Sequence, residues 1–195
     1  FGSERTRLLY GSNYAVARKP TMAGEEEVFR DSTGLIVYKN PSALPRVWTV
    51  HQLIVAKNPQ DADRLMHDSN FDLRNKTFGY SPASGLQQCE GDSVESFKRD
   101  ANSSTAVVDM KCAGMLVESE NDAPGWSATI DGQKAPIYQA YTALRGVVVG
   151  PGKHTIEMRY RPLSVMAGAA ATFSAFLAAL ALCLLPRLQR RQNGV

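Results

Sequence analysis

The sequence predicts a mainly β fold: an extracytoplasmic, antiparallel β-sandwich-like domain with a minor helix, followed by one C-terminal transmembrane helix. Two observations carry this prediction. Residues 105–160 hold short runs of alternating apolar and polar residues separated by turn residues, and residues 165–185 hold no charge. We therefore divide the 195 residues into a β-rich domain over 1–163, a span over 164–186 and a short basic cytoplasmic tail over 187–195.

The first hundred residues are expected to form short strands and one helix. The predicted strands are residues 14–17, 25–30, 34–40 and 46–55. The last of these is expected to be the longest, because it is rich in β-branched and aromatic residues. A helix is predicted from Asn58-Pro59 to Asp68, since asparagine caps helix N-termini and proline fits the first helical position. Residues 70–102 give no clear pattern beyond a loop over 79–91.

The second half of the domain is defined by its turns. The predicted strands are residues 105–112, 115–120, 126–130, 134–138, 144–149 and 154–160. The pair Asp131-Gly132 is a strong two-residue hairpin turn, and the Gly-Pro-Gly sequence of residues 150–152 forms a second turn. Each strand has one apolar face to bury, and two packed sheets bury such faces most economically.

The uncharged run near the C-terminus is long enough to cross a bilayer, because its 21 residues at ~1.5 Å each span about 30 Å. The alternative is a buried core helix, since eight of these residues are alanine. The run has no polar face for water, which favours the membrane. Its small residues suit packing against other transmembrane helices of the same protein.

The arginines set the expected orientation. Arg187, Arg190 and Arg191 follow the span, and positive residues tend to stay in the cytoplasm. Three basic residues between 153 and 161 precede the span and weaken this signal. We therefore expect a cytoplasmic C-terminus and a main domain outside the cell membrane.

The cysteines offer a possible cross-link. Cys89 and Cys112 both lie in the polar part of the chain, whereas Cys183 lies in the span. The first two can form a disulfide if that part faces an oxidising compartment. The alternative is two unrelated buried thiols.

The sequence shows no catalytic, cofactor or metal site. His51, His67 and His154 have no metal-ligand spacing and none is near a cysteine in sequence, and neither a Gly-rich phosphate loop nor a nucleophile elbow occurs. Basic residues are scattered, which argues against nucleic acid as a partner. The chain begins at Phe1 rather than methionine, so we expect a fragment or a processed product of a longer protein.

Three residues around the last hairpins are candidates for ligand contact. Tyr138, Tyr141 and Arg145 flank a loop, and an exposed pair of tyrosines with an arginine can contact a glycan or a phosphate of an envelope polymer. Trp126 can also stack on a sugar, but its alternation with Ala128 favours a place in the core.

An ordered set of short motifs precedes the terminal span. The motifs are Asn40-Pro41, Leu44-Pro45-Arg46, Pro124-Gly125-Trp126, Asp131-Gly132, Leu144-Arg145-Gly146, Pro151-Gly152-Lys153-His154 and Tyr160-Arg161-Pro162. In this order, and over nearly the whole chain, they resemble the C-terminal end of YfhO-type bacterial membrane proteins. The cysteine pair is not part of this pattern.

The resemblance implies a larger polytopic protein of the bacterial inner membrane, similar to the GT-C class of glycosyltransferases. Such enzymes use lipid-linked sugars at the outer face of the membrane, and members are implicated in decorating envelope polymers such as lipoteichoic acid. Their catalytic acidic residues and a divalent cation site lie in loops near the N-terminal spans, which this chain does not include. The chain is then a non-catalytic region whose partners are the bilayer, the upstream helices and cell-envelope glycan.

The competing hypothesis is a module without enzymatic activity that is tethered by a single helix. Such a module would recognise envelope glycan or another membrane protein. A soluble hydrolase has little support, because the sequence offers no nucleophile, metal set or acid and base pair with convincing spacing.

Overall fold

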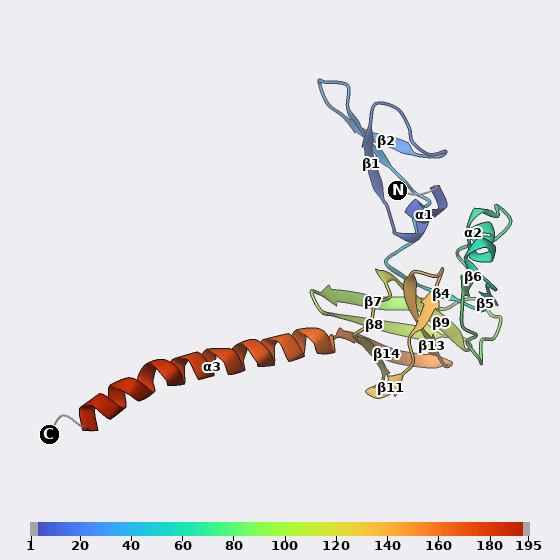
Figure 1. The fold of residues 1–195 in the computed structure, drawn as a ribbon. Helices are drawn as coiled ribbons and strands as arrows, with labels where there is room; N and C mark the ends of the chain where they lie inside the picture. Colours follow the sequence, from blue (N-terminus) through green and yellow to red (C-terminus); the bar gives the residue numbers. More distant parts are fainter. Residues whose placement is uncertain (1–3, 193–195) are drawn as a thin grey trace.

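A β-sandwich lies at the centre of the computed structural model, which describes residues 4–192, with side chains described up to Leu182. A small N-terminal sheet stands on one side of the sandwich and a long C-terminal helix projects from it (Figure 1). The predicted fold class is confirmed: the described chain is mainly β, with minor helices and one apolar helix of membrane-spanning length.

Two antiparallel sheets form the sandwich. The outer sheet has the strand order β11 (Gln133–Ala135), β10 (Trp126–Ile130), β14 (Gly152–Tyr160), β8 (Ser103–Met110), β7 (Ser93–Asp100). The inner sheet has the order β12 (Tyr138–Ala140), β13 (Leu144–Val149), β9 (Gly114–Asn121), β4 (Val47–Val50). The predicted turn at Asp131-Gly132 joins β10 to β11.

The inner sheet is buried on both faces. Leu116 and Val147 pack against Ile156 of the outer sheet in the core between the sheets. Met115 and Val117 point the other way, into a second core that contains Phe78. Because neither face of β9 and β13 meets water, these strands carry continuous apolar runs rather than the alternation of β8 and β14.

The second core is covered by a short crossover unit. Strand β5 (Gln52–Val55) leads into helix α2 (Pro59–His67), which returns the chain to β6 (Lys76–Gly79), parallel to β5. The predicted start of α2 is confirmed, because the side-chain oxygen of Asn58 accepts a hydrogen bond from the Asp61 N–H at 2.8 Å.

The prediction of one long strand over residues 46–55 is wrong. The chain turns at His51, so that β4 joins the inner sheet and β5 joins β6. The His51 N–H donates to the Asn75 carbonyl at 3.1 Å instead of continuing the ladder of β4. Both halves have strand-forming residues, but they pair with different partners, which the local composition does not encode.

The N-terminal residues form the small separate sheet. Helix α1 (Glu4–Leu9) precedes β1 (Tyr14–Ala17), and the predicted hairpin is confirmed as β2 (Glu26–Arg30) and β3 (Ile36–Lys39). The strand order is β1-β3-β2. Leu9, at the end of α1, is buried in the second core and fixes this segment to the sandwich.

Helix α3 (Leu163–Gln192) leaves the sandwich directly from the end of β14 (Figure 1). Its apolar stretch Leu163–Leu182 is not buried by any described residue, so it is not the core helix of this domain. The backbone stays helical past the predicted end of the span at 186 and through the first residues of the predicted tail.

Only two residues join β14 to α3, and a backbone hydrogen bond holds the first of them in place. The Arg161 N–H donates to the Gly125 carbonyl at 2.8 Å. Gly125 has φ +111°, and a Cβ there would lie 3.0 Å from the Cα of Pro162. Glycine is therefore required at this position both for its backbone angle and for its close approach to the junction.

We expect Gly125→Ala to destabilise the junction more than a matched change at Gly132. Gly132 also has positive φ, at +81°, but nothing lies within 4 Å of its missing Cβ. Left-handed strain costs about 1 kcal/mol in both variants, and the overlap with Pro162 adds at least ~1 kcal/mol in Gly125→Ala. Chemical unfolding of the full chain in detergent, followed by tryptophan fluorescence, measures the difference. Equal losses in the two variants would show that the junction is not tightly packed.

Candidate functional site

A buried ion pair lies between the two sheets at one end of the sandwich. Arg145 of β13 and Glu118 of β9 are direct cross-strand partners. The Arg145 Nη2 and Nε groups lie 2.9 and 3.1 Å from the two carboxylate oxygens of Glu118, and the side chains are 2% and 3% exposed. Such a two-pronged pair is stronger and more directional than a single contact.

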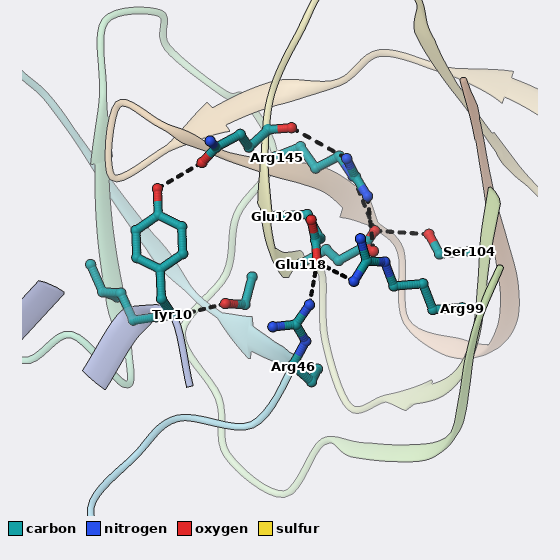
Figure 2. A network of polar contacts seen from close by, with 10 residues as sticks. Tyr10, Arg46, Arg99, Ser104, Glu118, Glu120 and Arg145 are labelled. Atoms are coloured by element: carbon teal, nitrogen blue, oxygen red, sulfur yellow. Dashed lines mark hydrogen bonds and ion pairs between the residues drawn. The ribbon is translucent and has the colours of Figure 1, made fainter. Parts of the chain in front are cut away.

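The outer sheet completes this pair from the opposite side. The Ser104 hydroxyl donates to Glu118 Oε2 at 2.8 Å (Figure 2). The Arg145 guanidinium lies over the indole ring of Trp126, with its central carbon 3.6 Å from the ring centroid. The pair therefore contacts both sheets, and a cation over an indole face gains further electrostatic stabilisation.

The expectation that Arg145 is exposed is wrong. Its guanidinium is fully engaged inside the sandwich by Glu118, Trp126 and the Asn121 carbonyl, which accepts from Nη1 at 3.3 Å. No part of this guanidinium is free to bind a phosphate. The sequence could not show this, because the partner carboxylate lies 27 residues away on another strand.

The expectation that Tyr141 is exposed is also wrong. Tyr141 is 3% exposed, and its hydroxyl lies 2.7 Å from the Leu73 carbonyl and 2.9 Å from that of Lys76. Burial strongly raises the pKa of this hydroxyl. The backbone at Tyr141 has φ +51°, which turns the ring into the second core rather than outward. Tyr138 is half-buried against the same core.

Trp126 lies where its alternation predicts. It packs against the core between the sheets, with its ring centroid 5.2 Å from that of Tyr160. One ring face is occupied by Arg145, so Trp126 supports the ion pair rather than offering that face to a sugar.

A groove follows the open edge of the sandwich, between β4 of the inner sheet and β7 of the outer sheet. Its lining combines apolar side chains, among them Val47, Val94 and Phe97, with two arginines and two acidic residues, which are Arg46, Arg74, Asp92 and Glu95. Both strands are the last in their sheets, so the groove lies where no further strand covers the sandwich. Local sequence patterns do not show such a groove, because they do not show which strands are edges.

Arg46, which lines one end of the groove, shares a carboxylate with Arg99, which lies outside the lining. Arg46 and Arg99 both contact the same carboxylate oxygen of Glu120, Arg99 at 2.8 Å (Figure 2). Their side chains are 43% and 48% exposed. Two guanidinium groups thus share one carboxylate, and their outer faces remain open to an anionic ligand.

The charged end of the groove is also the end next to helix α3. Asp100 of β7 pairs with Ser103 of β8, and Ser103 pairs with Arg159 near the end of β14. The strand register therefore places Arg99 at the end of the sandwich from which the helix departs.

The other end of the groove reaches Asp92, which leads to a second polar cluster. Asp92 Oδ2 lies 2.7 Å from His51 Nε2, and Oδ1 accepts from the Lys111 N–H at 2.7 Å. The ring's other nitrogen, Nδ1, lies 2.8 Å from the Gln87 carbonyl oxygen. The side chains of His51 and Asp92 are 12% and 4% exposed.

Cys89 and Cys112 form a disulfide beside this histidine. His51 Nδ1 lies 3.6 Å from Cys112 Sγ and 4.0 Å from Cys89 Sγ. The three atoms lie within 4.8 Å of one another, a spacing that suits metal ligands, but disulfide sulfurs are not the thiolates that bind metals. Local sequence spacing does not reveal this cluster, because 38 and 61 residues separate His51 from the two cysteines.

Residues 86–172 match the family model described as bacterial membrane protein YfhO. This part of the chain is similar to that family. The matched segment contains the whole outer sheet, most of the inner sheet, the junction and the first residues of α3. Comparison with curated proteins and with solved structures gave no match. The similarity to a family of membrane proteins and the apolar helix both support a place in the membrane.

We expect Arg145→Ala to destabilise the sandwich by about 3–5 kcal/mol, because it leaves the Glu118 carboxylate buried without its partner. Arg159→Ala is the matched control, since Arg159 is also on a strand and pairs with Glu157 at 3.0 Å, but in solvent. Chemical unfolding of the full chain in detergent gives both values. The double change Arg145→Met with Glu118→Leu should recover much of the loss. Equal stability of the Arg145 and Arg159 variants would contradict the role of the buried pair.

Proposed function

We propose that this chain is the non-catalytic C-terminal region of a GT-C-like glycosyltransferase of the bacterial inner membrane. Its groove holds the cell-envelope polymer that the enzyme glycosylates. The observation that carries the proposal is the open guanidinium pair, Arg46 and Arg99, at the end of the groove next to helix α3. An anionic polymer held there lies near the membrane surface, where lipid-linked sugars are available.

The junction supports this placement. Since two residues separate β14 from α3, the sandwich stays against the bilayer once the helix is inserted. The arginines after the span favour a cytoplasmic C-terminus, and the sandwich then lies outside the cytoplasm. The Cys89–Cys112 disulfide agrees with an oxidising compartment.

The chemistry of the groove favours a polymer with phosphate groups. Arginine binds phosphate through two parallel hydrogen bonds, and the half-exposed groups of Arg46 and Arg99 are open to such contacts. Phe97 gives the groove an aromatic surface on which a sugar ring can pack. The catalytic acids of the transferase belong, by family resemblance, to extracytoplasmic loops outside this chain.

The test is binding of poly(glycerol phosphate) to the full chain in nanodiscs. We expect the Arg46→Gln, Arg99→Gln double variant to bind at least tenfold more weakly than the wild type and with a smaller dependence on salt. Arg64→Gln is the matched control, because Arg64 on α2 is also an exposed arginine paired with a carboxylate, that of Asp61. Equal affinities of the double variant and the wild type would refute the groove as the polymer site.

A tethered binding module without enzymatic activity is the second candidate. Helix α3, whose stretch Leu163–Leu182 is long and apolar enough to cross a membrane, would supply the anchor of such a module. An assay of sugar transfer from a lipid-linked donor distinguishes the two candidates. It uses membranes that contain the protein with its native upstream sequence. Loss of this transfer when the sandwich is deleted would support the transferase, whereas absence of transfer by the intact protein would leave the tethered module.

A further inference from the structure

We propose that Cys89–Cys112 is an exchangeable disulfide, which reacts with an external dithiol with the assistance of His51 and Asp92. The proposal is independent of the polymer-binding function. It rests on three features of the cluster: the position of the histidine, the access to one sulfur, and the hydrogen bonds that hold the surrounding loop when the disulfide opens.

His51 is placed to act on the leaving sulfur. Its Nδ1 lies 3.6 Å from Cys112 Sγ, closer than to Cys89 Sγ at 4.0 Å. Asp92 binds the opposite ring nitrogen at 2.7 Å and fixes the direction of the ring. Cys112, His51 and Asp92 thus lie in a row. The same order of sulfur, histidine and carboxylate is found where a base, held by an orienting group, activates a thiol.

Both cysteines are half-buried, but Cys89 is the one that faces an open pocket. It lines an open pocket together with Gln88, Glu90 and Lys76, whereas Cys112 does not line this pocket. Attack on Cys89 makes Cys112 the leaving group, and Cys112 is the sulfur next to His51. The sulfur that is attacked and the sulfur that His51 assists are therefore the two ends of the same bond, as the exchange requires.

The exchange conserves electrons and protons. One thiol of the donor dithiol loses its proton to solvent, and the resulting thiolate attacks Cys89 Sγ. The Cys89–Cys112 bond breaks, and Cys112 leaves as a thiolate that receives a proton from His51 Nδ1. The second donor thiol returns a proton to His51 Nδ1 and attacks the donor's own sulfur in the mixed disulfide, and Cys89 leaves as a thiolate that takes a proton from solvent. The donor becomes a cyclic disulfide and supplies both electrons, and the chain gains two thiols.

The loop that carries Cys89 stays attached when the disulfide opens. The Gln87 N–H donates to the Ala113 carbonyl at 2.8 Å, and the Ala113 N–H donates to Gln87 Oε1 at 3.3 Å. The contact between Asp92 and the Lys111 N–H adds a third hydrogen bond. The two sulfurs therefore remain near each other after reduction and can be oxidised again.

The test is the rate of reduction by dithiothreitol, measured on the full chain in detergent by maleimide labelling, with Cys183→Ala in every variant. We expect the disulfide to be reduced at least tenfold more slowly in His51→Gln than in the otherwise unchanged chain. His154→Gln is the matched control, because His154 also pairs with an aspartate, Asp131 at 2.7 Å, and is expected to have no effect. If the disulfide of His51→Gln is reduced as fast as that of the otherwise unchanged chain, or faster, the proposal is wrong. A His51 that only holds the structure together would shield the disulfide, and its loss would not slow reduction.

A second measurement keeps the proposal testable if His51→Gln unfolds the loop. In the Cys89→Ser, Cys183→Ala variant, Cys112 is the one thiol and lies beside His51, and we expect iodoacetamide to alkylate it at least tenfold faster than in the same variant with His51→Ala. The melting temperatures of both variants show whether the fold is kept. Equal alkylation rates in two folded variants would show that His51 does not activate Cys112.

Discussion

The buried pair of Arg145 and Glu118 is the interaction on which the rest of the structure depends. Charges inside a protein are tolerated only when they are paired and hydrogen-bonded, and here both sheets contribute partners. The pair therefore fixes how the two sheets lie on each other at the end from which α3 leaves. The junction and the charged end of the groove both belong to this end, so their positions follow from the same interaction.

Three features lie along one edge of the sandwich. The guanidinium pair of Arg46 and Arg99 is next to the membrane helix, the groove follows β4 and β7, and the histidine–aspartate pair with its disulfide lies at the far end. Asp92 belongs both to the groove and to this last cluster, so a polymer in the groove and a thiol at Cys89 would approach neighbouring surfaces.

The sequence predicts most of the elements because their signals are local. Asp131-Gly132 defines a turn, Asn58-Pro59 starts a helix, and an uncharged run of spanning length defines α3. It does not predict what depends on pairing between distant segments. Arg145 and Tyr141 look exposed because their partners are remote in sequence, and His51 meets the cysteines only because the chain turns between β4 and β5. Burial of a polar residue depends on its partner, which a local pattern does not contain.

The central claim is that the sandwich lies against the outer surface of the membrane and that α3 crosses to the cytoplasm. Labelling of spheroplasts with a membrane-impermeant maleimide tests it most directly. The two variants carry Ser96→Cys on β7 or Gly194→Cys near the C-terminus, each with Cys183→Ala and with the Cys89–Cys112 disulfide kept, so that the new cysteine is the one outside the disulfide. The account predicts that the cysteine at position 96 is labelled in intact spheroplasts and that the one at 194 is labelled only after permeabilisation. Labelling at 194 and protection at 96 in intact spheroplasts would contradict it.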